Sequence, residues 1–151
     1  MRQSSLLGGL VAFVGLVLYF FLMKSLGLIH VVELRALNLL FLIGGILFAI
    51  KWEQKHWGKG FNYFDGLISG AGAGLMGVIP FALFIFIYLE FIDPAFMQQI
   101  REQEIMGHYL TSFNAAFVIF IEGTASGLLA TYTIMQYIKA HIGYHQHENH
   151  S

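Results

Sequence analysis

Four long runs of apolar residues, separated by shorter polar segments, divide the chain. They cover approximately residues 6–23, 34–51, 63–92 and 110–139. A helix needs roughly 20 mostly apolar residues to cross the hydrocarbon core of a bilayer. The pattern therefore predicts an all-α polytopic membrane protein with four transmembrane helices, which form a single domain over residues 1–140.

The first run lies between Arg2 and Lys24. A secretory signal peptide also begins with a short basic segment and an apolar run, and Ser25-Leu26-Gly27 resembles a cleavage site. The apolar core of a signal is usually about 7–15 residues long, which is shorter than this run. We therefore expect an uncleaved first transmembrane helix.

A short amphipathic helix is expected between the third and fourth runs. Asp93 can cap a new helix, and Pro94 suits its first position. The segment Ala95–Met106 then offers apolar residues on one side, as a helix lying along the outer membrane surface would. A groove for a partner protein is the alternative interpretation.

Composition supports the assignment to membranes. Hydrophobic residues make up 57% of the chain and charged residues 11%, whereas soluble domains carry about 25% charged residues. The net charge of −1 gives no support for nucleic-acid binding. The chain has no cysteine, which excludes disulfides, thiolate catalysis and cysteine-ligated metal sites.

The distribution of basic residues predicts the orientation. Lys51–Asn62 is the most basic loop, and with four spans it shares one side with both termini. That side carries Arg2, Lys51, Lys55, Lys59 and Lys139, and the other carries Lys24, Arg35 and Arg101. The positive-inside rule therefore places both termini in the cytoplasm.

Small residues recur every four positions in the third and fourth runs. Gly66, Gly70 and Gly74 form one ridge, and Gly123 and Gly127 form a second. Such spacing lets helix backbones approach closely in lipid, so we expect both ridges to be helix-packing sites. The glycine-rich segment around Gly70 is not expected to bind phosphate, because no strand precedes it and no Lys-Ser/Thr follows.

Glu122 is the ionisable residue near the middle of the fourth run. A carboxylate at that depth costs about 2.5 kcal/mol or more by insertion scales, and it is a functional candidate by default. Thr111, Glu122 and Thr133 are spaced eleven apart and so lie nearly in line, which predicts that Glu122 points into the bundle. Its candidate partners are Arg35, Asn38, Ser126 and Thr133, although Arg35 can instead extend to water from the membrane border.

The end of the chain, residues 141–151, is rich in histidine. Imidazoles bind metals well, but short polar termini are usually disordered. We expect a disordered cytoplasmic tail, no metal site and no cofactor.

The layout resembles a bacterial membrane family catalogued as domain of unknown function 4199. The resemblance rests on the four runs, on Glu33-Leu34-Arg35-Ala36-Leu37-Asn38 at the start of the second, on Asp93-Pro94 after the third, and on Glu122 with its glycines before Lys139. It implies a multi-pass protein of the bacterial cytoplasmic membrane. It implies no activity or substrate.

Three classes of function remain open. The glycine ridges favour a non-enzymatic structural, assembly or interaction protein, acting as a homo-oligomer or with another membrane protein. Glu122 favours a small ion- or proton-coupled transporter or channel as the alternative. An intramembrane enzyme is not expected, because no nucleophile elbow, metal-binding helix motif or carboxylate pair is present.

Overall fold

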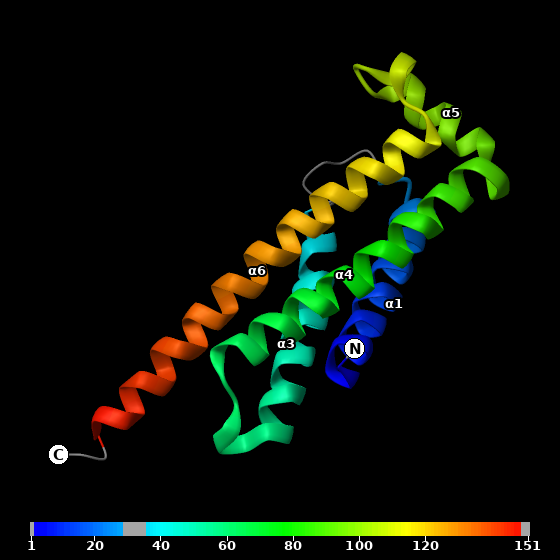
Figure 1. The fold of residues 1–151 in the computed structure, drawn as a ribbon. Coiled ribbons are helices and arrows are strands. Elements are labelled where there is room, and N and C mark those ends of the chain that lie inside the picture. The colour runs from blue at the N-terminus through cyan, green and yellow to red at the C-terminus, as the bar shows by residue number, and fades with distance from the viewer. Residues whose placement is uncertain (1, 29–35, 149–151) are drawn as a thin grey trace.

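The computed structural model describes residues 2–28 and 36–148 of the 151-residue chain (Figure 1). In this part of the chain all regular structure is helical. The α-helices are α1 (Gln3–Ser25), α3 (Leu37–Trp57), α4 (Tyr63–Ile87), α5 (Pro94–Gln103) and α6 (Ser112–Glu148). Short 3₁₀ turns occupy Gly58–Gly60 and Gly107–Tyr109, and a π-helical turn, Tyr88–Ile92, extends α4.

Four of these segments are long and apolar enough to cross a membrane: Gln3–Ser25, Leu37–Trp57, Tyr63–Ile92 and Ser112–Ala140. They coincide with the four apolar runs, so the four long helices predicted from the sequence are confirmed. α1 packs against α3 and α4, while α6 packs mainly along α4 and over a shorter stretch against α3. The start of α1 and the end of α6 lie at one end of the bundle, and α5 lies at the other (Figure 1).

The helix of the second run extends further than expected. The segment Lys51–Trp57, predicted to be a loop, continues α3 without interruption, and Gly58 ends it with a backbone φ of 49°. Lys, Glu and Gln are good helix formers, so polarity alone did not break the helix. Glu53, part of this segment, is consequently buried against the bundle.

The connection after α4 follows the prediction from Asp93 and Pro94. Asp93 caps α5 by accepting a hydrogen bond from the backbone N–H of Phe96 at 3.0 Å, and Pro94 is the first helical residue. A short α-helix, α5, lies at the expected place, and its amphipathic character stays a prediction. Its buried residues, Phe96 and Met97, join an apolar cluster at this end of the bundle. Its position on a membrane surface stays a prediction.

The glycine ridges of α4 and α6 face one another within a single chain. A Cβ atom added at Gly70 would lie 2.6 Å from Cγ2 of Thr131, and one added at Gly74 would lie 3.7 Å from Cα of Gly127. Gly66 abuts the Met135 side chain, and Gly123 abuts Val78. Packing within one chain therefore occupies both ridges, so they do not indicate a free surface for self-association.

Two apolar clusters form the core. One lies near α5 and includes Leu16, Phe81, Ile85, Tyr88 and Phe96. The other lies nearer the termini and includes Ala12, Leu42, Ile46, Ile50, Val78 and Met135. α6 covers this core thinly, since only 11% of its most apolar stretch is buried, against 39% for α4.

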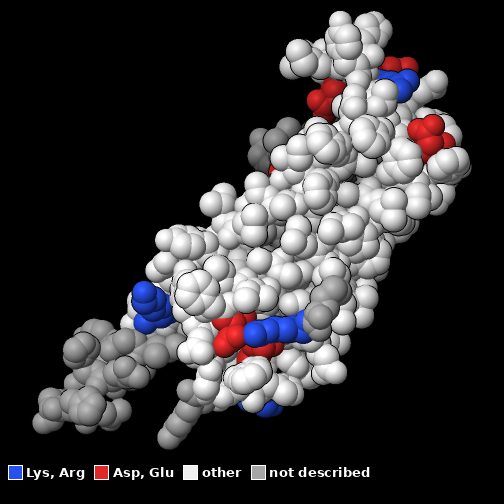
Figure 2. All heavy atoms as spheres, viewed as in Figure 1, with Lys and Arg blue, Asp and Glu red and all other residues white. Residues whose placement is uncertain are grey.

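Charged side chains gather toward the two ends of the bundle. On the face shown in Figure 2, the surface between them is almost entirely free of charged groups. Large apolar side chains are exposed on all four long helices, among them Leu18, Leu40, Leu83 and Leu129.

The end of the chain differs from the expectation of a disordered tail. α6 continues through residues 141–148, so the backbone of that segment is helical. Residues 149–151 and the side chains of residues 141–148 lie outside the described part of the structure.

Candidate functional site: a cavity around Glu122

A cavity of about 500 Å³ opens between α1, α3, α4, α5 and α6. Its walls are mostly apolar, and Leu16, Phe20, Phe81, Ile85, Phe96 and Ile119 contribute to them. Ligand pockets commonly have volumes of about 300–1,000 Å³ and apolar walls with a few convergent polar groups. The cavity has both properties.

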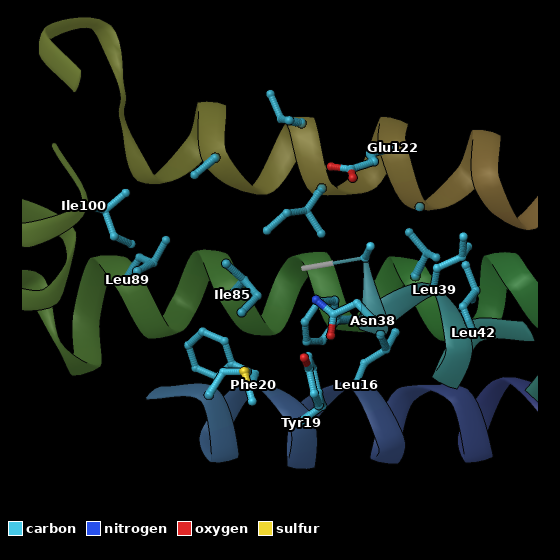
Figure 3. Close-up of a pocket in the computed structure, with 18 of the residues that line it drawn as sticks. Leu16, Tyr19, Phe20, Asn38, Leu39, Leu42, Ile85, Leu89, Ile100 and Glu122 are labelled. Carbon is cyan, nitrogen blue, oxygen red and sulfur yellow. The ribbon is translucent and has the colours of Figure 1, made fainter. Parts of the chain in front are cut away.

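Glu122 supplies the central carboxyl group of the cavity. Its side chain lines the cavity from α6 (Figure 3). The residue is nevertheless exposed, so the cavity does not enclose it. The carboxyl group thus lies at an accessible wall of an apolar space.

Asn38, at the start of α3, projects into the same cavity from another wall (Figure 3). Its Oδ1 atom is buried and accepts no hydrogen bond within the described part of the chain. A buried acceptor without a partner costs about 1–3 kcal/mol. The structure brings Asn38 and Glu122 to one cavity, and Ser126 joins them. Arg35, the remaining candidate partner from the second run, lies outside the described residues.

The threonines expected in line with Glu122 do not face the bundle. Thr133 is exposed, and its hydroxyl donates to the carbonyl of Leu129 at 2.8 Å. Thr111 is also exposed and accepts a hydrogen bond from the backbone N–H of Asn114 at 3.1 Å. Thr133 follows the buried Thr131 by two residues, or about 200° around α6, so it lies on the opposite side of the helix, and a role beside Glu122 stays a prediction.

Thr131 occupies the position that sequence reasoning missed. It is fully buried, it packs against Gly70, and its hydroxyl donates to the carbonyl of Gly127 at 2.8 Å. The signal that could have identified it is the spacing of four from Gly127, which continues the ridge begun at Gly123. Small residues at this spacing mark a close helix contact.

A buried ionic cluster lies at the end of the bundle that holds the start of α1. Arg2 donates to Oε1 of Glu53 at 2.8 Å and to Oδ1 of Asp65 at 2.6 Å. Ser4 donates to the other carboxylate oxygen of Glu53 and accepts from Ser69 at 2.9 Å. The hydrogen bond to Asp65 is the main cause of a raised pKa of Arg2. The cluster joins α1, α3 and α4.

Asp65 also caps the start of α4. Its carboxylate accepts a hydrogen bond from the backbone N–H of Asn62 at 3.2 Å. The ion pair with Arg2 adds a tertiary contact to this local one.

A second ionic cluster lies at the opposite end. Lys24 pairs with Oδ2 of Asp93 at 2.6 Å and contacts the hydroxyl of Tyr88. The hydrogen bond from Lys24 is the main cause of a lowered pKa of Asp93, and the N–H of Phe96 adds to it. This cluster joins α1 to the start of α5.

No group of three histidine, aspartate or glutamate side chains suited to a metal occurs among the described residues. The candidate site is the cavity, whose lining carries polar groups from Tyr19, Asn38, Glu104, Glu122 and Ser126.

Comparison with known proteins places most of this architecture in one family. A family model described as "Protein of unknown function (DUF4199)" matches residues 5–108, which include α1, α3, α4 and α5. The match ends before α6, so Glu122 lies beyond it. No curated protein matches the chain, and no solved structure matches it.

Proposed function

Because the chain belongs to the family of proteins of unknown function DUF4199, we propose its function from its geometry. It is a polytopic protein of a bacterial cytoplasmic membrane, and its role is non-enzymatic interaction. Its interaction site is the cavity around Glu122, which takes a ligand from within the bilayer. The apolar cavity with convergent polar groups is the observation that carries this proposal.

The two ionic clusters support the placement in a membrane. Arg2 and Lys24 stand at the two ends of α1, about 33 Å apart at 1.5 Å per residue. The hydrocarbon core of a bilayer is about 30 Å thick. Each cluster would therefore lie at one membrane border, with the uncharged surface of Figure 2 in the lipid.

The orientation follows from basic residues near the ends of the helices. Lys51, Lys55 and Lys139 lie toward the end that holds the start of α1, whereas Lys24 and Arg101 lie toward the end that holds α5. The positive-inside rule then places both termini in the cytoplasm and α5 on the outer side. α5 would lie along the outer surface.

Binding from the bilayer accounts for the position of the cavity. Its walls come from the half of the bundle nearer α5, and Glu122 in its lining is exposed on α6. In the proposed orientation this half lies in the outer leaflet. An apolar ligand could reach the cavity from the lipid without crossing either ionic cluster.

The proposal is tested with photoreactive alkyl probes in nanodiscs. An alkyl diazirine should label cavity-lining peptides such as those that contain Ile85 or Ile119, and Ala115→Phe, which fills the cavity, should suppress this labelling. Leu83→Phe places a phenyl ring on the exposed surface instead and should leave the labelling unchanged. Labelling that ignores Ala115→Phe would contradict a ligand role for the cavity.

Ion or proton transport through Glu122 is the second candidate, favoured by the accessible carboxyl group in the cavity. Against a continuous path stands the packing of Ile46, Ile50 and Met135, which are fully buried toward the end that holds the start of α1. Proteoliposomes should therefore show no proton flux above that of Glu122→Gln. A flux that Glu122→Gln abolishes would favour transport instead.

A further inference from the structure

Polar and apolar side chains are unevenly distributed along the cavity. Asn38 and Glu122 lie toward the middle of the bundle, while Leu89 and Ile100 line the part near α5 (Figure 3). Glu104, which follows α5, adds a carboxyl group to the lining. From Ala115 to Ser126 the cavity follows α6 for three turns, or about 16 Å. One end can thus receive a polar group, and the remainder can receive a hydrocarbon chain.

The polar part of the cavity holds one acceptor that the protein leaves unsatisfied. The buried Oδ1 of Asn38 has no donor within the described part of the chain. The carboxyl oxygens of Glu122 add further acceptors, whereas the hydroxyls of Tyr19 and Ser126 can both donate and accept. A ligand group placed here would be held by the hydrogen bonds that it donates, and it would remove the cost of leaving Asn38 unsatisfied.

The described lining of the cavity offers no cation to an anionic head group. It includes Glu104 and Glu122 but no lysine, arginine or histidine. A carboxylate or sulfate head would therefore lack a cationic partner among these residues, whereas a hydroxyl or an ammonium group can donate a hydrogen bond to Asn38.

We propose that the cavity binds a single-chain amphiphile whose polar head donates hydrogen bonds, such as a long-chain alcohol or primary amine. The head lies at Asn38 and Glu122, and the chain lies along the apolar wall toward α5. This assignment rests on the proposed function, because it names the class of ligand that the cavity takes. It makes Asn38 a specificity-determining residue.

The test compares four competitors of the same chain length against a dodecanol diazirine probe bound to the full chain in nanodiscs. Dodecylamine carries donors and charge, and dodecanol carries a donor alone. Dodecyltrimethylammonium carries charge without a donor, and dodecanoate carries negative charge. We expect dodecylamine and dodecanol to displace the probe at concentrations about tenfold lower than the other two, since one hydrogen bond to a charged or buried group is worth about 1–3 kcal/mol.

Asn38→Leu provides the matching variant. It removes the buried acceptor at similar volume, so the protein should fold, with a melting temperature equal to or above that of the natural chain. Labelling by the dodecanol probe should fall about tenfold in this variant. Gln136→Leu removes an exposed amide that donates to Tyr63 at 3.2 Å, and it should leave labelling unchanged.

The outcomes separate the two proposals. Cavity labelling that all four competitors displace equally, or that Asn38→Leu leaves intact, would overturn the choice of head group while preserving a lipid-derived ligand. The absence of cavity labelling by any alkyl probe would overturn the proposed function itself. Labelling confined to the outer groove between α1 and α3, which Leu10 and Phe41 line, would also do so.

Discussion

Nζ of Lys24 and Oδ2 of Asp93 lie 2.6 Å apart, which ties the end of α1 to the first residue before α5. The same ammonium group lies 4.6 Å from the ring centroid of Tyr88 and 4.9 Å from that of Phe96. Both rings belong to the apolar cluster that borders the cavity. The ammonium group of Lys24 therefore contacts Tyr88, Asp93 and Phe96 together at the end of the bundle where the cavity begins.

This ion pair predicts a loss of stability in acid. The pKa of Asp93 is lowered in the folded protein, chiefly by the hydrogen bond from Lys24. Its stabilising contribution is present above the pKa of the unfolded state, about 3.9, and is lost as pH falls through the lower folded value. Melting temperatures in nanodiscs should therefore fall below about pH 4.

The variant Asp93→Asn isolates this contribution. It should lower the melting temperature at neutral pH and reduce the further loss in acid. Glu102→Gln changes an exposed carboxylate on the same helix and should behave as the natural chain does. An unchanged acid profile in Asp93→Asn would show that other carboxylates cause the loss.

Two glycines on one ridge should respond in opposite ways to the same substitution. Gly70→Ala would place its new methyl group 2.6 Å from Cγ2 of Thr131, so we expect a destabilisation of about 1–3 kcal/mol from overpacking. Gly74→Ala meets nothing closer than 3.6 Å. It should be neutral or stabilising by up to about 1 kcal/mol, because alanine favours helix over glycine. Unfolding in mixed micelles measures both, and equal effects would contradict the described packing of α4 on α6.

The Arg2 cluster should be sensitive to the loss of its cation. Glu53 is buried, so Arg2→Gln leaves a carboxylate with fewer partners inside the bundle. We expect a destabilisation of about 1–3 kcal/mol, below the range for fully buried pairs because Arg2 is partly exposed. The double variant Arg2→Gln/Glu53→Gln should recover part of this loss. Additive effects in the double-mutant cycle would show that the two residues do not interact.

The absence of cysteine allows a direct test of orientation. Single cysteines at Lys59 and at Glu102 lie in the two connections that the proposed topology separates. A membrane-impermeant maleimide should label the cysteine at position 102 in intact spheroplasts, and the one at position 59 only after lysis. The reverse pattern would invert the orientation and leave the four-helix bundle unaffected.

The apolar runs predicted the number and positions of the long helices, because the length of such a run shows directly whether it can cross a bilayer. Asp93 and Pro94 predicted the cap of α5, because capping depends only on neighbouring backbone groups. The apolar runs did not locate the end of α3, since Lys51–Trp57 is polar yet helical. Polar side chains indicate contact with water and do not by themselves mark the end of a helix. The helix ends at Gly58, where the backbone φ becomes positive.

The site was harder to predict than the helices. Glu122 and Asn38 were identified as candidates, but their meeting at one cavity depends on how α3 and α6 are rotated. The rotation of α6 depends on contacts such as the packing of Thr131 on Gly70 of α4, two residues that are distant in the sequence. Glu53 was overlooked, although it continues the buried spacing of Ile46, Ala49 and Ile50 along α3.

The thin packing of α6 has a consequence for how the molecule is made. α1, α3 and α4 contact one another extensively, and the helices of this trio emerge from the ribosome before α6. These three helices can therefore pack together first, and α6 then packs against them. The cavity is completed only at that final step, so the proposed binding site would form last in a nascent chain.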